Sequence, residues 1–213
     1  MPARLRPTAP IAAAAILVGD PGRALMLAQE LLVAPKMSNH ARGLWGYSGE
    51  TAAGEELTIQ ATGMGGPSAA VVLADLAELG VQRAVRIGTC ASLGSLGLGD
   101  LLLVSAARSP NGGGATPDPE LTAALARSLP GAHPGVAVSL DSLQRPEREQ
   151  PSVLAEGADM QTAGLLAAAT AHGVKVGAVL IVTERSDSGQ LPDDELEAAA
   201  KGSARAAAAV LSP

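Results

Sequence analysis

The sequence predicts an α/β fold in which helices cover both faces of a mixed, mostly parallel sheet. The chain has 213 residues, of which 47% are hydrophobic, so it can bury one substantial core and is not of the disordered class. Short apolar segments alternate with helix-like segments, which is typical of a sheet buried between two helical layers. We therefore expect a single three-layer α/β/α domain over residues 1–213.

The first half of the chain contains four expected strands and two expected helices. Apolar runs predict strands at residues 13–18, 44–48, 57–62 and 84–87. The first helix is expected at residues 21–33, with Asp20 at its N-cap and Pro21 at its first helical position. The second helix is expected at residues 69–79 and ends at Gly80, a favourable C-capping residue.

The second half of the chain continues the same alternation. Strands are expected at residues 101–107, 135–139 and 175–183. Helices are expected at residues 120–128, 160–172 and 193–211. A loop rich in glycine and proline is expected at residues 110–119, and the polar residues 144–151 are expected to be mobile.

Composition and charge argue against several classes of function. The formal net charge of −6 does not suit a nucleic-acid-binding protein, which needs a basic surface. Cys90 is the only cysteine, so no intramolecular disulfide can form and a reducing cytoplasm is the expected setting. The apolar run at residues 11–18 predicts a strand rather than a signal peptide, and no run approaches the roughly 18 residues of a membrane helix. The three histidines lack zinc-ligand spacing, so no metal is expected.

The segment 18–24, Val-Gly-Asp-Pro-Gly-Arg-Ala, is a candidate anion site. An expected strand ends at Gly19, a helix begins, and Arg23 lies in its first turn. Backbone N–H groups at a helix start, the helix dipole and a guanidinium all favour an anion there. The alternative is an ordinary strand-to-helix turn with a surface arginine.

A glycine-rich segment follows the expected strand at residues 57–62. Gly63, Gly65 and Gly66 precede Pro67, which implies that the backbone approaches another group closely. The spacing is not that of a dinucleotide-binding loop. A tight turn with no ligand is the alternative.

An arginine inside an apolar strand marks a third candidate site. Arg86 lies in Val-Arg-Ile-Gly-Thr, and a buried guanidinium without a partner is costly, so it calls for a counter-anion. Thr89 lies just past the expected strand end, where α/β proteins bind ligands. A structural salt bridge to Arg86 is the alternative.

These three motifs, in this order and spacing, resemble the nucleoside phosphorylase-I family, which includes hexameric purine nucleoside phosphorylases and uridine phosphorylases. Residues 39–49 and 157–164 also resemble the bacterial purine enzymes, the latter matching their Met-Glu helix start. The likeness covers residues 15–108 closely and 135–211 more loosely. It implies a pentosyltransferase that uses inorganic phosphate, with no cofactor, to split a nucleoside into a free base and ribose-1-phosphate.

The resemblance also implies roles for individual residues. Phosphate would be held by Gly19, Arg23, Arg86 and Thr89. The nucleoside would be lined by Met64, Cys90, Ala91, Leu143, Asp159, Met160 and Gln161. Arg42 would reach the phosphate of a neighbouring subunit, which implies at least a dimer and commonly a hexamer. Arg86 would stabilise the attacking phosphate, and Glu184 would help to protonate the departing base.

The sequence departs from the family pattern at several of these positions. Gln161 stands where the family has a glutamate that binds the ribose hydroxyls, and its amide can still accept one such hydrogen bond. Ala91 narrows the base pocket, Glu184 is one methylene longer than the usual aspartate, and Leu143 falls near the place of an aromatic residue. Cys90 has no histidine partner and is expected to line the pocket rather than to act as a nucleophile.

Three readings of the function remain open from the sequence. A phosphorylase is favoured, with purine nucleosides slightly preferred over uridine, for which Gln144, Arg145 and Arg148 could read the base. A hydrolytic nucleosidase would not need the arginine residues. A nucleoside- or phosphate-binding homologue without turnover is the third reading, since Gln161 carries no charge.

Overall fold

The computed structural model describes residues 4–110, 113–143, 154–187 and 189–212. Its helices are α1 (Pro21–Leu31), the short 3₁₀ turn η1 (Ala41–Gly43), α2 (Gly66–Glu78), α3 (Pro119–Ser128), α5 (Thr162–His172) and α6 (Asp193–Leu211). Its strands are β1 (Ala14–Val18), β2 (Leu32–Asn39), β3 (Gly46–Thr51), β4 (Glu56–Ala61), β5 (Arg83–Ser92), β6 (Leu101–Arg108), β7 (Gly114–Ala115), β8 (His133–Ser139), β9 (Gly157–Asp159), β10 (Lys175–Arg185) and β11 (Gly189–Gln190).

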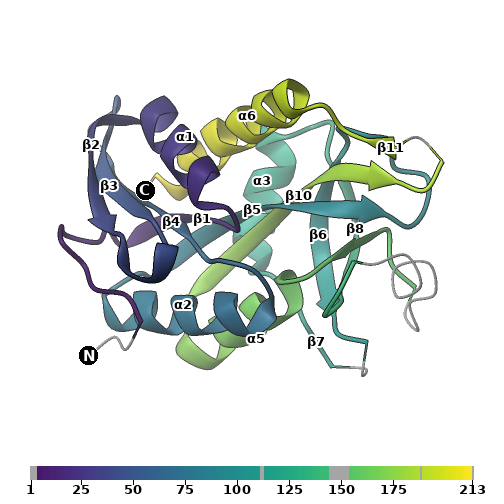
Figure 1. Ribbon diagram of the computed structural model, residues 1–213, viewed down its shortest axis with the longest axis horizontal. Coiled ribbons are helices and arrows are strands. Elements are labelled where there is room, and N and C mark those ends of the chain that lie inside the picture. Colours follow the sequence, from purple (N-terminus) through teal and green to yellow (C-terminus); the bar gives the residue numbers. More distant parts are fainter. Residues whose placement is uncertain (1–3, 111–112, 144–153, 188, 213) are drawn as a thin grey trace.

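The helices lie on both faces of the sheet, as predicted. Figure 1 shows α1, α3 and α6 on one face and α2 and α5 on the other. Leu27 of α1 and Leu125 of α3 belong to the buried cluster on the first face. Leu73 of α2 and Leu166 of α5 belong to the cluster on the second face. The two clusters give the three-layer α/β/α arrangement, and the predicted fold class is confirmed.

The sheet is mixed, with its parallel ladders in the middle. β4, β1, β5 and β10 are neighbours and run parallel, and β6, β8 and β9 form a second parallel group. β2 and β3 are antiparallel at one edge. β5 pairs with both β10 and β9, and β10 pairs with β6, so β5-β10-β6-β8-β9 closes into a ring. The sequence did not predict this closure.

Several helix ends follow from local sequence. The Asp20 carboxylate accepts a hydrogen bond from the Arg23 backbone N–H at 2.7 Å, so the predicted N-cap of α1 is confirmed. Helix α6 has the predicted bounds. The N-terminal ends of α2 and α5 approach closely, since a Cβ on Gly164 would lie 3.0 Å from Gly66 Cα. Because glycine has no side chain at these positions, the first turns of α2 and α5 can lie against each other.

Some elements differ from the prediction. The first helix ends at Leu31 and continues directly into β2, a strand that was not predicted because it is an edge strand with Pro35 and few apolar residues. β5 extends to Ser92, since residues 89–91 continue the pairing with β10. Helix α5 begins at Thr162 rather than at residue 160. β7 lies within the predicted loop at residues 110–119, and residues 144–151, which were predicted to be mobile, lie outside the described residues.

Within the described ranges, none of the helices combines the length and the apolar character that crossing a membrane requires.

Candidate active site

A cavity of about 340 Å³ opens at the carboxyl ends of the parallel strands β1, β4 and β5. It is lined by residues from segments 19–23, 63–65 and 86–89, together with Leu143, Met160 and Gln161. Its size is that of a small-molecule site, and the carboxyl ends of parallel strands are where α/β proteins bind ligands. The three motifs singled out in the sequence therefore meet at one cavity.

The structure brings eight of the predicted site residues to this cavity. They are Gly19, Arg23, Met64, Arg86, Thr89, Leu143, Met160 and Gln161. Five other predicted residues are not among the described lining residues: Arg42, Cys90, Ala91, Asp159 and Glu184. Gln144, Arg145 and Arg148 lie outside the described residues.

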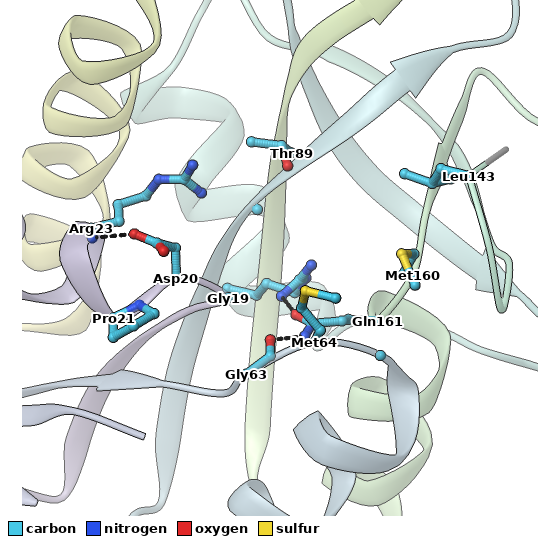
Figure 2. Close-up of a pocket in the computed structure, with 13 residues that line it drawn as sticks. Gly19, Asp20, Pro21, Arg23, Gly63, Met64, Thr89, Leu143, Met160 and Gln161 are labelled. Carbon is cyan, nitrogen blue, oxygen red and sulfur yellow. Dashed lines mark hydrogen bonds between the residues drawn. The ribbon is translucent and has the colours of Figure 1, made fainter. Parts of the chain in front are cut away.

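The two ends of the cavity differ in chemical character. Figure 2 shows Arg23 and Asp20 on one side, Leu143 and Met160 on the opposite side, and Gln161 and Met64 between them. The first side combines a guanidinium with the start of helix α1, and the second is apolar. An anion suits the first side and an apolar or aromatic group suits the second.

Arg23 is a cation held in a partly desolvated place. Burial lowers the pKa of Arg23 from its usual value, Asp20 opposes this decrease, and the charge of Arg86 adds to it. The Asp20 carboxylate also accepts from the Arg23 backbone N–H, and so it caps α1. Because an arginine stays protonated in proteins, a desolvated Arg23 close to a second cation favours the binding of an anion.

Arg86 is the centre of a buried polar network, although it also lines the cavity. Only 3% of the residue is exposed. Its Nη2 donates to Asp159 Oδ2 at 3.0 Å, and its Nε donates to Thr162 Oγ1 at 2.9 Å. A Cβ on Gly88 would lie 2.7 Å from Arg86 Nη2, so glycine leaves room for the guanidinium. The structural salt bridge considered as an alternative is present, and it orients a cation that still faces the cavity.

Asp159 lies behind the cavity and anchors Arg86. It is 1% exposed and forms the ion pair described above. Its Oδ2 also accepts from the Thr162 backbone N–H at 2.9 Å, and its Oδ1 accepts from Ser139 Oγ. The carboxylate is thus saturated by groups of its own chain, which makes it a support for Arg86 rather than a surface of the cavity.

Gln161 uses both atoms of its amide within the chain. Its Oε1 accepts from Arg86 Nη1 at 2.6 Å and lies 3.3 Å from Thr62 Oγ1. Its Nε2 donates to the Gly63 carbonyl, as Figure 2 shows. The residue is 5% exposed. The amide predicted to accept a ribose hydroxyl is therefore already hydrogen-bonded at both ends.

Cys90 is buried in β5 and is not among the residues that line the cavity. Its side chain is 1% exposed and packs in the cluster under α2 and α5. Burial is the main cause that raises the pKa of Cys90 to about 12; Asp159 adds to this increase and Arg86 opposes it. The thiol therefore stays protonated near neutral pH, and a protonated thiol is a poor nucleophile. The structure does not place it on the cavity wall.

Glu184 and Ala91 lie next to each other at the end of the strand pair β5–β10. They are register partners just after a bulge in β10, two residues beyond Thr89 along β5. Glu184 also pairs with Gln190 of β11. Both residues are thus placed beyond the described wall of the cavity, on the strands that form it.

Arg42 lies in the exposed turn η1 and adopts an unusual backbone conformation. Its φ angle is +60°, a region that residues other than glycine rarely enter. Asn39 Nδ2 and Gln60 Nε2 both donate to the Leu44 carbonyl and fix the end of the turn. A strained conformation that buried side chains support is a frequent feature of functional positions.

Sequence reasoning missed several residues that support the site. Thr62 joins the ends of β1 and β4, because its N–H donates to the Val18 carbonyl at 2.7 Å. Ser139 and Thr162 hold Asp159, and Gly88 makes room for Arg86. Gly88 had a sequence signal, since it follows a buried arginine by two residues. Serine and threonine had none, because they are common everywhere on a chain. In the described part of the chain, no three His, Cys, Asp or Glu residues are grouped so that they could hold a metal ion.

All the residues that line the cavity lie in a part of the sequence that is similar to a known protein family. A sequence profile described as "Phosphorylase superfamily" matches residues 13–212. Among curated relatives, a protein from Oceanobacillus iheyensis is 40% identical over 79 residues, which are 37% of this chain and 33% of the relative. A protein from Caldanaerobacter subterraneus is 42% identical over 84 residues, which are 39% of this chain and 36% of the relative. A protein from Clostridium novyi is 36% identical over 104 residues, which are 48% of this chain and 44% of the relative.

All three relatives bear the name "Purine nucleoside phosphorylase DeoD-type". The chain matches less than half of the length of each of them.

Proposed function

The chain belongs to the Phosphorylase superfamily, and from this premise we propose that it is a nucleoside phosphorylase. The proposed reaction uses inorganic phosphate to cleave the N-glycosidic bond of a nucleoside, giving a free base and ribose-1-phosphate. One observation carries the proposal: a single cavity has Arg23 and the start of α1 at one end, apolar side chains at the other, and Arg86 as a second cation in its wall. A phosphate bound beside a nucleoside likewise has an anionic group at one end and an aromatic base at the other.

Phosphate is proposed to bind between Gly19, Arg23, Arg86 and Thr89, all of which line the cavity. Gly19 supports this placement, because the fold itself does not require glycine there. A Cβ on Gly19 would lie 3.5 Å from both Gln161 Oε1 and the Gly63 carbonyl oxygen, an ordinary contact distance. A glycine that the fold does not need suggests that the backbone N–H region must approach a ligand closely.

The nucleoside is proposed to extend from this phosphate toward Leu143. Met64 and Met160 would contact the ribose, and the side chain of Met64 is 82% exposed at the rim. The base would lie toward Leu143 and the strand ends that carry Ala91 and Glu184. Purine nucleosides are favoured over uridine, since the curated relatives bear a purine name.

The proposed chemistry follows from this arrangement. As the glycosidic bond breaks, positive charge develops on the ribose, and a bound phosphate dianion stabilises it and then attacks C1. Arg23 and Arg86 hold the phosphate in place while the base leaves with its electron pair. A carboxyl group at Glu184 would share a proton with the departing base and thereby ease its departure. No cofactor is needed, because phosphate itself is the second substrate.

We also propose that the active protein is a homo-oligomer, a hexamer with a dimer as its minimal unit, in the cytoplasm. Arg42 supports the dimer, since it is exposed and held in a fixed turn outside the cavity of its own chain. Val33, Met37 and Trp45 are exposed apolar side chains on or beside the edge strand β2, close to this turn in the sequence. An interface there would bury them and bring Arg42 toward a neighbouring site.

The proposal is tested by incubating the purified chain with inosine, adenosine, guanosine or uridine, each with and without phosphate. Chromatography of the products separates the three readings of the function. Release of base only with phosphate supports the phosphorylase and identifies the base. Release without phosphate would show a nucleosidase, and binding without release would show a non-catalytic homologue.

A further inference from the structure

We propose that Gln161 is a positioning residue, whose amide clamps the glycine loop at residues 63–65 onto Arg86 and thereby shapes the phosphate end of the cavity. The clamp deepens the proposed function and rests on it for its catalytic consequence. It differs from the role expected from the sequence, in which Gln161 would itself bind a ribose hydroxyl. The amide forms one hydrogen bond through its oxygen to Arg86 and one through its nitrogen to Gly63.

The surroundings of Gln161 require one acceptor and one donor in a fixed orientation. The guanidinium of Arg86 can only donate, so it needs the Oε1 atom. The backbone carbonyl of Gly63 can only accept, so it needs the Nε2 hydrogens. Turning the amide over would place donor against donor and acceptor against acceptor. A glutamine meets both needs, whereas an ionised glutamate offers acceptors only.

The clamped loop carries groups that face the ligand. Gly63 and Gly65 have φ angles of +73° and +81°, and Met64 between them is 82% exposed. The start of the loop is tied to β1 through Thr62, and the Ser68 hydroxyl donates to the Thr62 carbonyl at 2.6 Å. The Gln161 amide adds the connection from Gly63 to Arg86. The position of the glycine loop is therefore coupled to the position of the Arg86 guanidinium.

Charge gives the clamp a second consequence. Among the described residues, the charged groups around Gln161 are Arg86 on β5, Asp159 on β9, and Arg23 and Asp20 at the start of α1, while the thiol of Cys90 is buried farther along β5. The loop and α5 add only Thr62 and Thr162, which do not titrate. Arg86 and Asp159 already balance each other. A carboxylate at position 161 would give this cluster an excess negative charge and weaken its attraction for phosphate.

Two substitutions separate the parts of the clamp. Gln161→Glu keeps the acceptor for Arg86, removes the donor to Gly63 and adds a charge. Gln161→Met keeps the length of the side chain and removes both hydrogen bonds without adding a charge. Thr58→Val is the matched control, because Thr58 on β4 is fully buried and bonds to Ser48 Oγ at 2.9 Å, outside the cavity.

The first measurement is the dissociation constant of inorganic phosphate, by calorimetry on the full chain between pH 6 and pH 8.5. Relative to wild type at each pH, we expect Gln161→Glu to weaken phosphate binding by about tenfold at pH 8.5, since it removes the neutral hydrogen bond to Gly63, which contributes up to about 1.5 kcal/mol, and adds a charge that repels the anion. The loss should persist at pH 6, because the adjacent guanidinium of Arg86 keeps a carboxyl group at this position ionised. Gln161→Met should also weaken binding at every pH, and Thr58→Val should leave binding unchanged.

The second measurement is amide hydrogen exchange of residues 63–66 without phosphate, which tests the clamp independently of any catalysis. Exchange should be faster in both Gln161 variants and unchanged in Thr58→Val. If wild type cleaves no nucleoside while these patterns hold, the proposed function fails and the clamp stands. Unchanged exchange in the Gln161 variants would overturn the clamp. Phosphate binding by Gln161→Glu that equals or exceeds that of wild type at pH 8.5 would overturn it as well.

Discussion

The ion pair of Arg86 and Asp159 allows the sharpest prediction of stability. Asp159→Asn would leave the guanidinium of Arg86, 3% exposed, without its carboxylate. It would also place an NH₂ group against donors from Thr162 or Ser139. Breaking a buried pair by removing one partner costs about 3–5 kcal/mol. For a domain of this size about 1 kcal/mol lowers the melting temperature by about 2–4 °C, so we expect a decrease of about 6–20 °C.

The assay is thermal and urea unfolding followed by circular dichroism, with and without phosphate. Phosphate should stabilise Asp159→Asn by more degrees than wild type, because the bound anion replaces the missing counter-charge on Arg86. Arg86→Met combined with Asp159→Asn should lose less stability than the sum of the two single changes. Glu120→Gln is the control, since its ion pair with Lys175 is exposed and should change stability little. A loss below about 1 kcal/mol in Asp159→Asn, or no extra effect of phosphate, would refute this reasoning.

Three further predictions concern the cavity and its surroundings. Gly19→Ala should keep the wild-type melting temperature but weaken phosphate binding about tenfold, since its Cβ fits the fold without phosphate and obstructs the ligand. Gly88→Ala should lower both the melting temperature and the affinity for phosphate, because its Cβ would lie 2.7 Å from Arg86 Nη2. Equal effects of the two changes in calorimetry and thermal unfolding would contradict this. The folded-state pKa of Cys90, raised from 9.0 to about 12, means that the unfolded chain loses its thiol proton first, so stability should fall as pH rises above 9. Urea unfolding at pH 8 to 10.5 should therefore show a stability gap between wild type and Cys90→Ala that narrows with pH, and a constant gap would argue against it. Arg42→Ala should lose phosphorolysis. Mixing it with inactive Arg23→Ala subunits should restore part of the activity, because a hybrid dimer contains one site with both arginines. No recovery after subunit exchange would show that Arg42 does not act in the neighbouring site.

The helices and the longer buried strands were predictable because their signals are local, whereas the three-residue buried strand β9 was not predicted. Asp20 and Pro21 mark the start of α1, and the acidic first turn and apolar spacing mark α6, whose bounds agree with the prediction. Strand β2 was missed because an edge strand with one exposed face and Pro35 lacks a clear apolar alternation. The ring formed by β5-β10-β6-β8-β9 depends on pairings far apart in sequence, which local patterns do not encode.

The candidate site was predictable as a set of segments but not as a set of contacts. The glycines and arginines at residues 19–23, 63–65 and 86–89 do line one cavity. The sequence placed Asp159 and Cys90 on its wall, whereas the structure puts Asp159 behind Arg86 and buries Cys90 in the core, outside the described lining of the cavity. These positions depend on contacts between residues far apart in the sequence, such as the pair of Arg86 and Asp159, which local patterns do not encode.

Cleavage of a purine nucleoside in ¹⁸O-labelled water with unlabelled phosphate is the most direct test of the proposed function. Phosphate held by Arg23 and Arg86 should attack the ribose, so mass spectrometry should find ribose-1-phosphate without ¹⁸O at C1. Free ribose carrying ¹⁸O, formed at the same rate without phosphate, would mean that water is the nucleophile and would contradict the phosphorylase.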